Sequence, residues 1–136
     1  SNFAAPLDRL IADDAAFFTA YIDNKLVACG GVVLHAAEPP YGEIKRVFVD
    51  KEQRGRGLAT AMMQHLESFL RDCGIGIARL EVGSLQPEAI RLYRRLGYAD
   101  RGPFGNYEHD SLCLFMEKLL RPADHPVISF LDRQMN

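Results

Sequence analysis

The spacing of apolar and polar residues predicts alternating strands and helices along the chain. Apolar positions spaced three and four apart over residues 5–16 predict a short amphipathic helix. A strand follows over 17–22 and a return strand over 26–34, joined by a tight turn at Asn24, a residue type that tolerates left-handed backbone. Residues 35–42 form a loop. The first third therefore predicts a helix followed by a β-hairpin.

The middle of the chain has the pattern of a strand–helix–strand unit. A β-branched and aromatic strand is predicted over 43–49, and a long apolar stripe predicts a helix over 58–73. A second strand follows over 77–83, and Pro87 then opens a helix that stops at Gly97. Two strands joined through one helix are expected to run parallel.

The remaining pattern completes one domain. A short strand and a glycine-rich loop occupy 98–111, and a final strand covers 112–119. This order predicts an α/β (α+β) fold, with a mixed, mostly antiparallel sheet and helices on both faces. We expect one domain over 1–120 and a C-terminal tail over 121–136 that lies on or against the surface.

The strand over 43–49 has an irregular phase. Under strict alternation, Ile44 is out of phase with Val47 and Val49. A β-bulge near Arg46 would cause this slip. A central strand that is buried on both faces would show the same pattern, because phase then carries no information. The sequence leaves both interpretations open.

Composition and charge narrow the range of partners. The chain is 48% hydrophobic and 25% charged, with a net charge of −2, which argues against a nucleic-acid partner or a polybasic membrane anchor. No apolar run reaches the ~20 residues that cross a bilayer. The three cysteines lack CxxC spacing and the four histidines lack metal-ligand spacing. We therefore expect a cytoplasmic protein without a metal, either a monomer or a homodimer.

The stretch QRGRGLAT, residues 53–60, lies where the strand over 43–49 gives way to a helix. A helix start offers unpaired N–H groups and a partial positive charge. Gly55 and Gly57 let the backbone approach a ligand, and the neighbouring arginines add donors suited to phosphate oxygens. Together these features predict an anion-binding turn for a ligand with two or more phosphate groups.

Two other phosphate-binding motifs fit this turn poorly. A Walker A loop needs a lysine after its second glycine, and none is present. The dinucleotide fingerprint needs a third glycine where Thr60 stands. An ordinary surface loop and a cradle for another nucleotide remain alternatives.

The motif RGRGLA, residues 54–59, resembles the acetyl-CoA signature of the GCN5-related N-acetyltransferase (GNAT) family. Residues 87–98, PEAIRLYRRLGY, resemble a second family segment, and residues 114–118, LFMEK, resemble its last strand. The resemblance covers roughly residues 17–120. Members usually open with a strand and one or two helices, so we expect that N-terminal strand and helix to be missing and the domain over 1–120 to be incomplete at its start.

The resemblance implies transfer of an acetyl group from acetyl-CoA to an amine of a small molecule or a peptide N-terminus. The cosubstrate's pantetheine arm would lie between the two parallel strands where they splay. Gln86 stands where many members have asparagine, and its amide is suited to the same contact. The implied cofactor-binding residues are Val47, Phe48, Val49, Arg54, Gly55, Arg56, Gly57, Leu58, Ala59, Thr60, Gln86 and Tyr93.

The resemblance also implies the catalytic residues. Tyr93 matches the family tyrosine beside the CoA sulfur, which acts as general acid, and Glu43 aligns with a family glutamate that acts as base. Glu81 is the rival base. A solvated carboxylate at Glu43, an ion pair at Glu81 and a packed tyrosine at Tyr93 are the structural alternatives. The loop over 104–109 is expected to border the acceptor site or to form a simple hairpin tip. A non-catalytic acyl-CoA-binding regulatory module is the alternative function.

Overall fold

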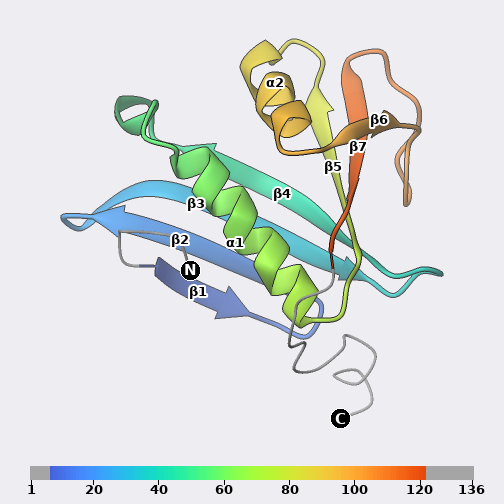
Figure 1. The fold of residues 1–136 in the computed structure, drawn as a ribbon, viewed down its shortest axis with the longest axis horizontal. Helices are drawn as coiled ribbons and strands as arrows, with labels where there is room; N and C mark the ends of the chain where they lie inside the picture. The colour runs from blue at the N-terminus through green and yellow to red at the C-terminus, as the bar shows by residue number, and fades with distance from the viewer. Residues whose placement is uncertain (1–6, 122–136) are drawn as a thin grey trace.

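The computed structural model describes residues 7–121, with side chains from residue 11 onward. Over this part of the chain one seven-stranded sheet has the order β1-β2-β3-β4-β5-β7-β6, with α1 lying across it (Figure 1). The elements are β1 (Leu7–Ile11), β2 (Ala15–Ile22), β3 (Lys25–His35), β4 (Tyr41–Val49), the 3-10 helix η1 (Lys51–Gln53), α1 (Leu58–Asp72), β5 (Ile77–Gly83), α2 (Pro87–Arg95), β6 (Ala99–Arg101) and β7 (Cys113–Leu119).

The central pair β4 and β5 is parallel, whereas the other neighbouring strands are antiparallel. The parallel pairing runs only from Gly42 opposite Ala78 to Ile44 opposite Leu80. Beyond these residues the two strands share no backbone pairing, and Figure 1 shows β5 turning away from β4 toward α2. The predicted mixed sheet with a splayed central parallel pair is confirmed.

A β-bulge interrupts β4, as one of the two interpretations of its phase predicted. Arg46 has left-handed backbone with φ of 58°, and the register between β3 and β4 shifts opposite it. Because of this slip, Ile44 and Val47 both contact the core on the helix side of the sheet. The first half of the strand is nevertheless buried on both faces, so the second interpretation holds for residues 41–44.

The helix predicted over residues 5–16 is wrong for the described residues, which begin at residue 7. Leu7–Ile11 is a strand that pairs antiparallel with β2, so a strand does precede the hairpin, contrary to expectation. No helix precedes β2 within residues 7–121. A short helix is marginal on its own, whereas pairing with the edge of an existing sheet satisfies the backbone of β1 through distant residues.

Both helices of the described chain pack on one core cluster. The residues of α1 that are fully buried there are Met62, Met63, Leu66 and Leu70, and α2 contributes Ile90 to the same cluster. A second cluster of Tyr41, Phe104 and Phe115 is covered by the loop between β6 and β7. The expectation of helices on both faces is therefore met on one face only within residues 7–121.

Two further findings concern membrane-spanning helices and the C-terminal tail. None of the helices within residues 7–121 is both long and apolar enough to cross a bilayer. The tail predicted over 121–136 lies, apart from Arg121, outside the described residues.

Candidate functional site

A groove of about 530 Å³ opens where β4 and β5 diverge, between the end of β4, the glycine turn and α2. Of the twelve predicted cofactor-binding residues, Arg56 alone does not line it. Three segments that are distant in sequence therefore meet in one groove. The predicted residues that line it are Val47, Phe48, Val49, Arg54, Gly55, Gly57, Leu58, Ala59, Thr60, Gln86 and Tyr93.

The two glycines of the turn have backbone that other residues adopt only with strain. Gly55 has φ of 83° and Gly57 has φ of 75°, both in the left-handed region. A side chain there costs roughly 1–2 kcal/mol. A Cβ atom added at either position would meet no atom within 4 Å. The glycines are thus required by backbone conformation, and they border open space that a ligand can enter.

The start of α1 leaves its first N–H groups without a side-chain cap. Gly57 is the N-cap residue, it provides no capping hydrogen bond, and the first turn carries no acidic residue. The N-cap residue and the first turn of α1 therefore supply no side chain that compensates the partial positive charge of the helix start. With the Arg54 guanidinium in the same groove wall, this turn fits the diphosphate of a nucleotide-type ligand.

Tyr93 lies in the wall of the groove formed by α2. Its ring packs edge-on against Tyr98, with the ring centroids 6.0 Å apart, and the residue is half-buried. Burial raises the pKa of the Tyr93 hydroxyl, so this group remains protonated at neutral pH. The structure thus places a protonated tyrosine side chain in the wall of the groove.

Glu43 points to the face of the sheet opposite the helices, which is the face that also carries Tyr41, two residues earlier. Its side chain is only 7% exposed. His35 Nε2 lies 3.0 Å from one carboxylate oxygen, Tyr107 donates to the other at 2.6 Å, and Lys45 Nζ lies 3.9 Å from that second oxygen. Glu43 is therefore not the solvated strand-end carboxylate that the sequence left open.

A second cavity, of about 250 Å³, adjoins Glu43 and is lined by His35, Glu43, Gly105, Asn106 and Tyr107. Glu43 comes one residue before Ile44, the last residue of β4 that pairs with β5. The cavity therefore borders the point at which the two strands begin to diverge. The loop predicted to border the acceptor site contributes three of its five lining residues.

Glu81, the rival base, is exposed on β5 and lines neither of these two cavities. Within the described chain it forms no ion pair with an arginine, contrary to the structural alternative. The charge of Glu81 nevertheless acts on Tyr107 in the loop between β6 and β7. The hydrogen bond to Glu43, burial, and the charges of Glu43 and Glu81 together raise the pKa of Tyr107.

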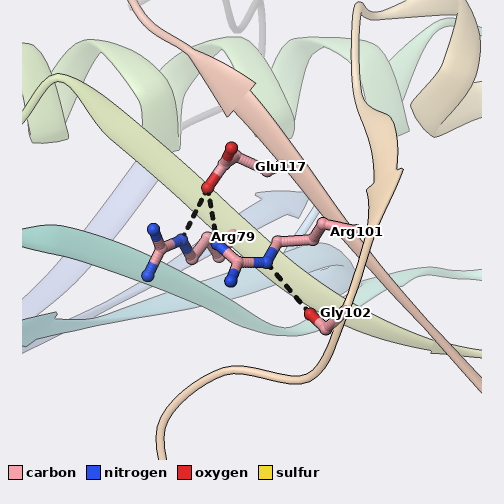
Figure 2. Close-up of polar contacts among 4 residues, drawn as sticks. All are labelled: Arg79, Arg101, Gly102 and Glu117. Carbon is pink, nitrogen blue, oxygen red and sulfur yellow. Dashed lines mark hydrogen bonds and ion pairs between the residues drawn. The ribbon is translucent and has the colours of Figure 1, made fainter.

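Two arginines that share one carboxylate fix the base of the loop between β6 and β7. Arg79 Nε and Arg101 Nη1 lie 2.8 Å and 2.7 Å from the same Glu117 oxygen, and Arg101 Nε donates to the Gly102 carbonyl at 3.0 Å (Figure 2). The Arg79 guanidinium also lies 4.3 Å from the centroid of the Tyr41 ring. This cluster connects β5, β6 and β7.

The Glu117 cluster makes stability depend on pH. Burial pushes the pKa of the Glu117 carboxyl upward, but hydrogen bonds from Arg79 and Arg101 outweigh it, so the pKa lies below its ordinary value. A lowered pKa contributes stability above the unfolded-state value that is lost as pH falls through the folded-state value. We expect the advantage of wild type over Glu117→Gln in urea unfolding to shrink between about pH 6 and about pH 3. An advantage that stays constant over this range, or an equal trend in the exposed control Glu108→Gln, would contradict the assignment.

The sequence did not single out His35 beside Glu43, and it placed Tyr107 only within the loop over 104–109. It also missed five residues that line the groove: Gln53, Glu88, Ala89, Leu92 and Arg95. His35 and Tyr107 reach Glu43 from 8 and 64 residues away, so no local pattern connects them. Gln53 lines the groove, and its side-chain oxygen is buried with no hydrogen-bond partner among the described residues. Its place directly before the first arginine of the turn was the only signal for it.

Comparison with known proteins places the sequence and the fold in one family. Residues 2–98 match the model of the acetyltransferase (GNAT) family. The chain is 40% identical over 120 residues to an IAA acetyltransferase of Azospirillum brasilense, covering 88% of this chain and 78% of that protein. A Klebsiella pneumoniae structure assigned to the acyl-CoA N-acyltransferases has a TM-score of 0.75 at 36% identity, covering 82% of this chain and 77% of that one.

A third relative shares the fold at lower identity. The PaiA N-acetyltransferase from Thermoplasma acidophilum, solved in complex with coenzyme A, has a TM-score of 0.67 at 20% identity, covering 78% of this chain and 61% of that one. The family match, the curated relative and the shared fold all agree. The chain belongs to the acetyltransferase (GNAT) family.

Proposed function

We propose that this chain transfers an acetyl group from acetyl-CoA to the primary amine of a small molecule or a peptide N-terminus. The observation that carries the proposal is one groove that joins an uncapped helix start, two left-handed glycines and the gap between diverging parallel strands. The similarity to an acetyltransferase at 40% identity supports it, as does the fold shared with a protein that was solved with coenzyme A.

The residues of the groove fit a CoA thioester from end to end. The first-turn N–H groups of α1 and the Arg54 guanidinium would hold the pyrophosphate, with Arg56 next to them. The end of β4, at Val47 and Val49, has no β5 partner and would pair with the pantetheine arm, while the Gln86 amide would contact the same arm. Bound in this way, acetyl-CoA supplies an activated acetyl group at the gap.

Direct attack by the amine leaves two proton transfers to the protein. A lysine-like ammonium with a pKa of ~10.4 costs about 4.6 kcal/mol to hold neutral at pH 7, whereas an α-amine near ~7.8 costs about 1 kcal/mol. A base therefore matters most for strongly basic acceptors, and Glu43 and Glu81 are the candidate carboxylates. Tyr93 would donate a proton to the departing sulfur, since burial keeps its hydroxyl protonated.

The test is a turnover screen that follows release of free CoA thiol over a panel of amino acids, polyamines, aminoglycosides and peptides. Thermal shifts with acetyl-CoA, ATP and NAD run beside it, because a ligand at 100 times its Kd stabilises by about 2.7 kcal/mol. Stabilisation by acetyl-CoA with turnover of at least one amine is expected. Stabilisation without any turnover would indicate the acyl-CoA-binding module, and selective stabilisation by ATP or NAD would indicate a different nucleotide ligand.

Gly57→Ala is expected to weaken acetyl-CoA binding about tenfold. The left-handed conformation costs an alanine roughly 1–2 kcal/mol, so the binding geometry of the turn becomes a minor state. The matched control is Gly76→Ala, whose added Cβ would also meet nothing within 4 Å, but on backbone outside the left-handed region. Isothermal titration calorimetry measures both affinities. Equal Kd values for the two variants would argue against this role of the turn.

A further inference from the structure

Both oxygens of the Glu43 carboxylate already have partners in the structure. His35 contacts Oε1 and Tyr107 donates to Oε2, and 7% of the side chain is exposed. The small exposed fraction and these two partners restrict a direct approach of an acceptor amine to Glu43. A proton that leaves the amine would more simply reach the carboxylate through one of its two partners.

Tyr107 is a poor proton acceptor. Its hydroxyl donates to Glu43 at 2.6 Å, and that hydrogen bond is the largest cause of the raised pKa of this tyrosine. The hydroxyl therefore keeps its proton and serves as a fixed donor. His35 is the remaining route.

The His35 ring is arranged to accept a proton. An ionised carboxylate only accepts hydrogen bonds, so the contact between Nε2 and Glu43 places the ring proton on Nε2 and leaves a lone pair on Nδ1. Nδ1 has no hydrogen-bond partner among residues 7–121, and His35 lines the cavity with 33% of its side chain exposed. The ring also stacks on Tyr41 at 4.5 Å and 12°, which fixes its orientation.

We propose that His35 is the group that takes the proton from the acceptor amine, with Glu43 as the positioning residue behind it. The inference rests on the proposed acetyl transfer and names a base for it that the sequence did not single out. The carboxylate orients the ring and balances the charge that forms on it. The cavity borders the start of the strand gap, which is where the acetyl group of a bound thioester would meet an amine.

The protons and electron pairs of the reaction balance with the groups named above. An ammonium N–H proton moves to His35 Nδ1, and the freed nitrogen lone pair forms the bond to the acetyl carbon as the carbon–sulfur bond breaks. Tyr93 gives its proton to the departing sulfur, and the second proton lost from the nitrogen passes through water to the Tyr93 oxygen, which restores the hydroxyl. His35 returns its proton to water through the open cavity.

Titratable groups lie near the imidazole on β4 and on the loop between β6 and β7. On β4, Glu43 contacts the ring, Tyr41 stacks on it, and Lys45 Nζ lies 3.9 Å from the Glu43 carboxylate. Tyr107 lines the same cavity from the loop. Arg79 of β5 lies over the Tyr41 ring on which His35 stacks. Glu43 is the carboxylate in direct contact with the ring, with His35 Nε2 3.0 Å from its oxygen.

The test compares wild type, His35→Ala and His35→Gln by kcat/KM against pH, with a lysine-like amine found in the turnover screen. We expect both variants to lose about 10²-fold near pH 7. The loss should shrink to a few-fold near the amine pKa of ~10.4, where the free amine needs no base. Added imidazole should partly restore His35→Ala. Glutamine can still donate a hydrogen bond to Glu43 but cannot take a proton. His35→Gln therefore distinguishes a role of His35 as a base from a role only as a hydrogen-bond partner of Glu43.

Acetyl-CoA affinity, measured by calorimetry, should stay within about threefold in both variants, which shows that the fold and groove are intact. A loss that is the same at every pH, or full activity in His35→Gln, would overturn the proposal and leave acetyl transfer standing. A wild type that turns over no amine, although acetyl-CoA stabilises it, would instead remove the proposed function, and this inference with it.

Discussion

Tyr93→Phe is expected to lower kcat about 10²- to 10³-fold while acetyl-CoA affinity stays nearly unchanged. The tyrosine is half-buried in the groove wall, and burial holds its hydroxyl in the protonated form. Phenylalanine keeps the packing against Tyr98 but has no proton to give. The departing thiolate, with an ordinary thiol pKa of ~8.5, would then have to find its proton in water.

Steady-state kinetics and calorimetry together check this prediction. The effect should fall on kcat rather than on the Kd of acetyl-CoA, since the hydroxyl acts as sulfur departs and contributes little to binding. Tyr21→Phe, at the end of β2 and outside both cavities, is the matched control and is expected to keep wild-type turnover. Wild-type kcat in Tyr93→Phe would remove this residue from the mechanism.

Glu67→Ala is expected to give the largest loss of stability, about 3–5 kcal/mol. The carboxylate is 3% exposed inside the helix–sheet core, with Tyr98 Oη and Lys118 Nζ each 2.8 Å away and Arg71 at 3.6 Å. Its removal leaves an ammonium and a buried hydroxyl without their partner. Unpaired buried polar groups are costly because water no longer solvates them.

Urea unfolding measures this loss, and a thermal scan should show a fall in Tm of roughly 10–20 °C. Asp72→Ala, at the exposed end of the same helix, is the control and is expected to change stability by less than about 0.5 kcal/mol. Adding Lys118→Met to Glu67→Ala should recover part of the loss, because the ammonium left without its partner is then gone. Losses that simply add would contradict the pairing of Glu67 with Lys118 as the cause.

Elements with strong local signals were predicted well from the sequence. The helix predicted over 58–73 is found as Leu58–Asp72, and the strand over 77–83 is found with those bounds. Pro87 opens α2 as expected. These signals are local because an apolar period, a proline at a first helical position and a left-handed glycine all act within a few residues.

Elements that depend on distant partners were not predicted well from the sequence. Residues 7–11 have apolar spacing that suits a helix, yet they form an edge strand because β2 offers backbone partners. The crossing of the chain from β5 through α2 to β6 places both helices against one core, which a linear pattern does not reveal. In each case a nonlocal contact outweighs a weak local preference.

The features of the candidate site also separate into those set by local sequence and those set by contacts between distant residues. The glycine turn before α1 and the irregular strand over 43–49 could be predicted from the residues alone, since each depends on backbone conformation or spacing within one segment. The tyrosine on α2 was singled out by the resemblance to the family. The tertiary structure alone decided that Glu43 is buried, that His35 and Tyr107 hold it, and that Glu67 faces Lys118. Hydrogen bonds between residues far apart in the chain exist only after the sheet has brought their strands together, and no local pattern encodes them.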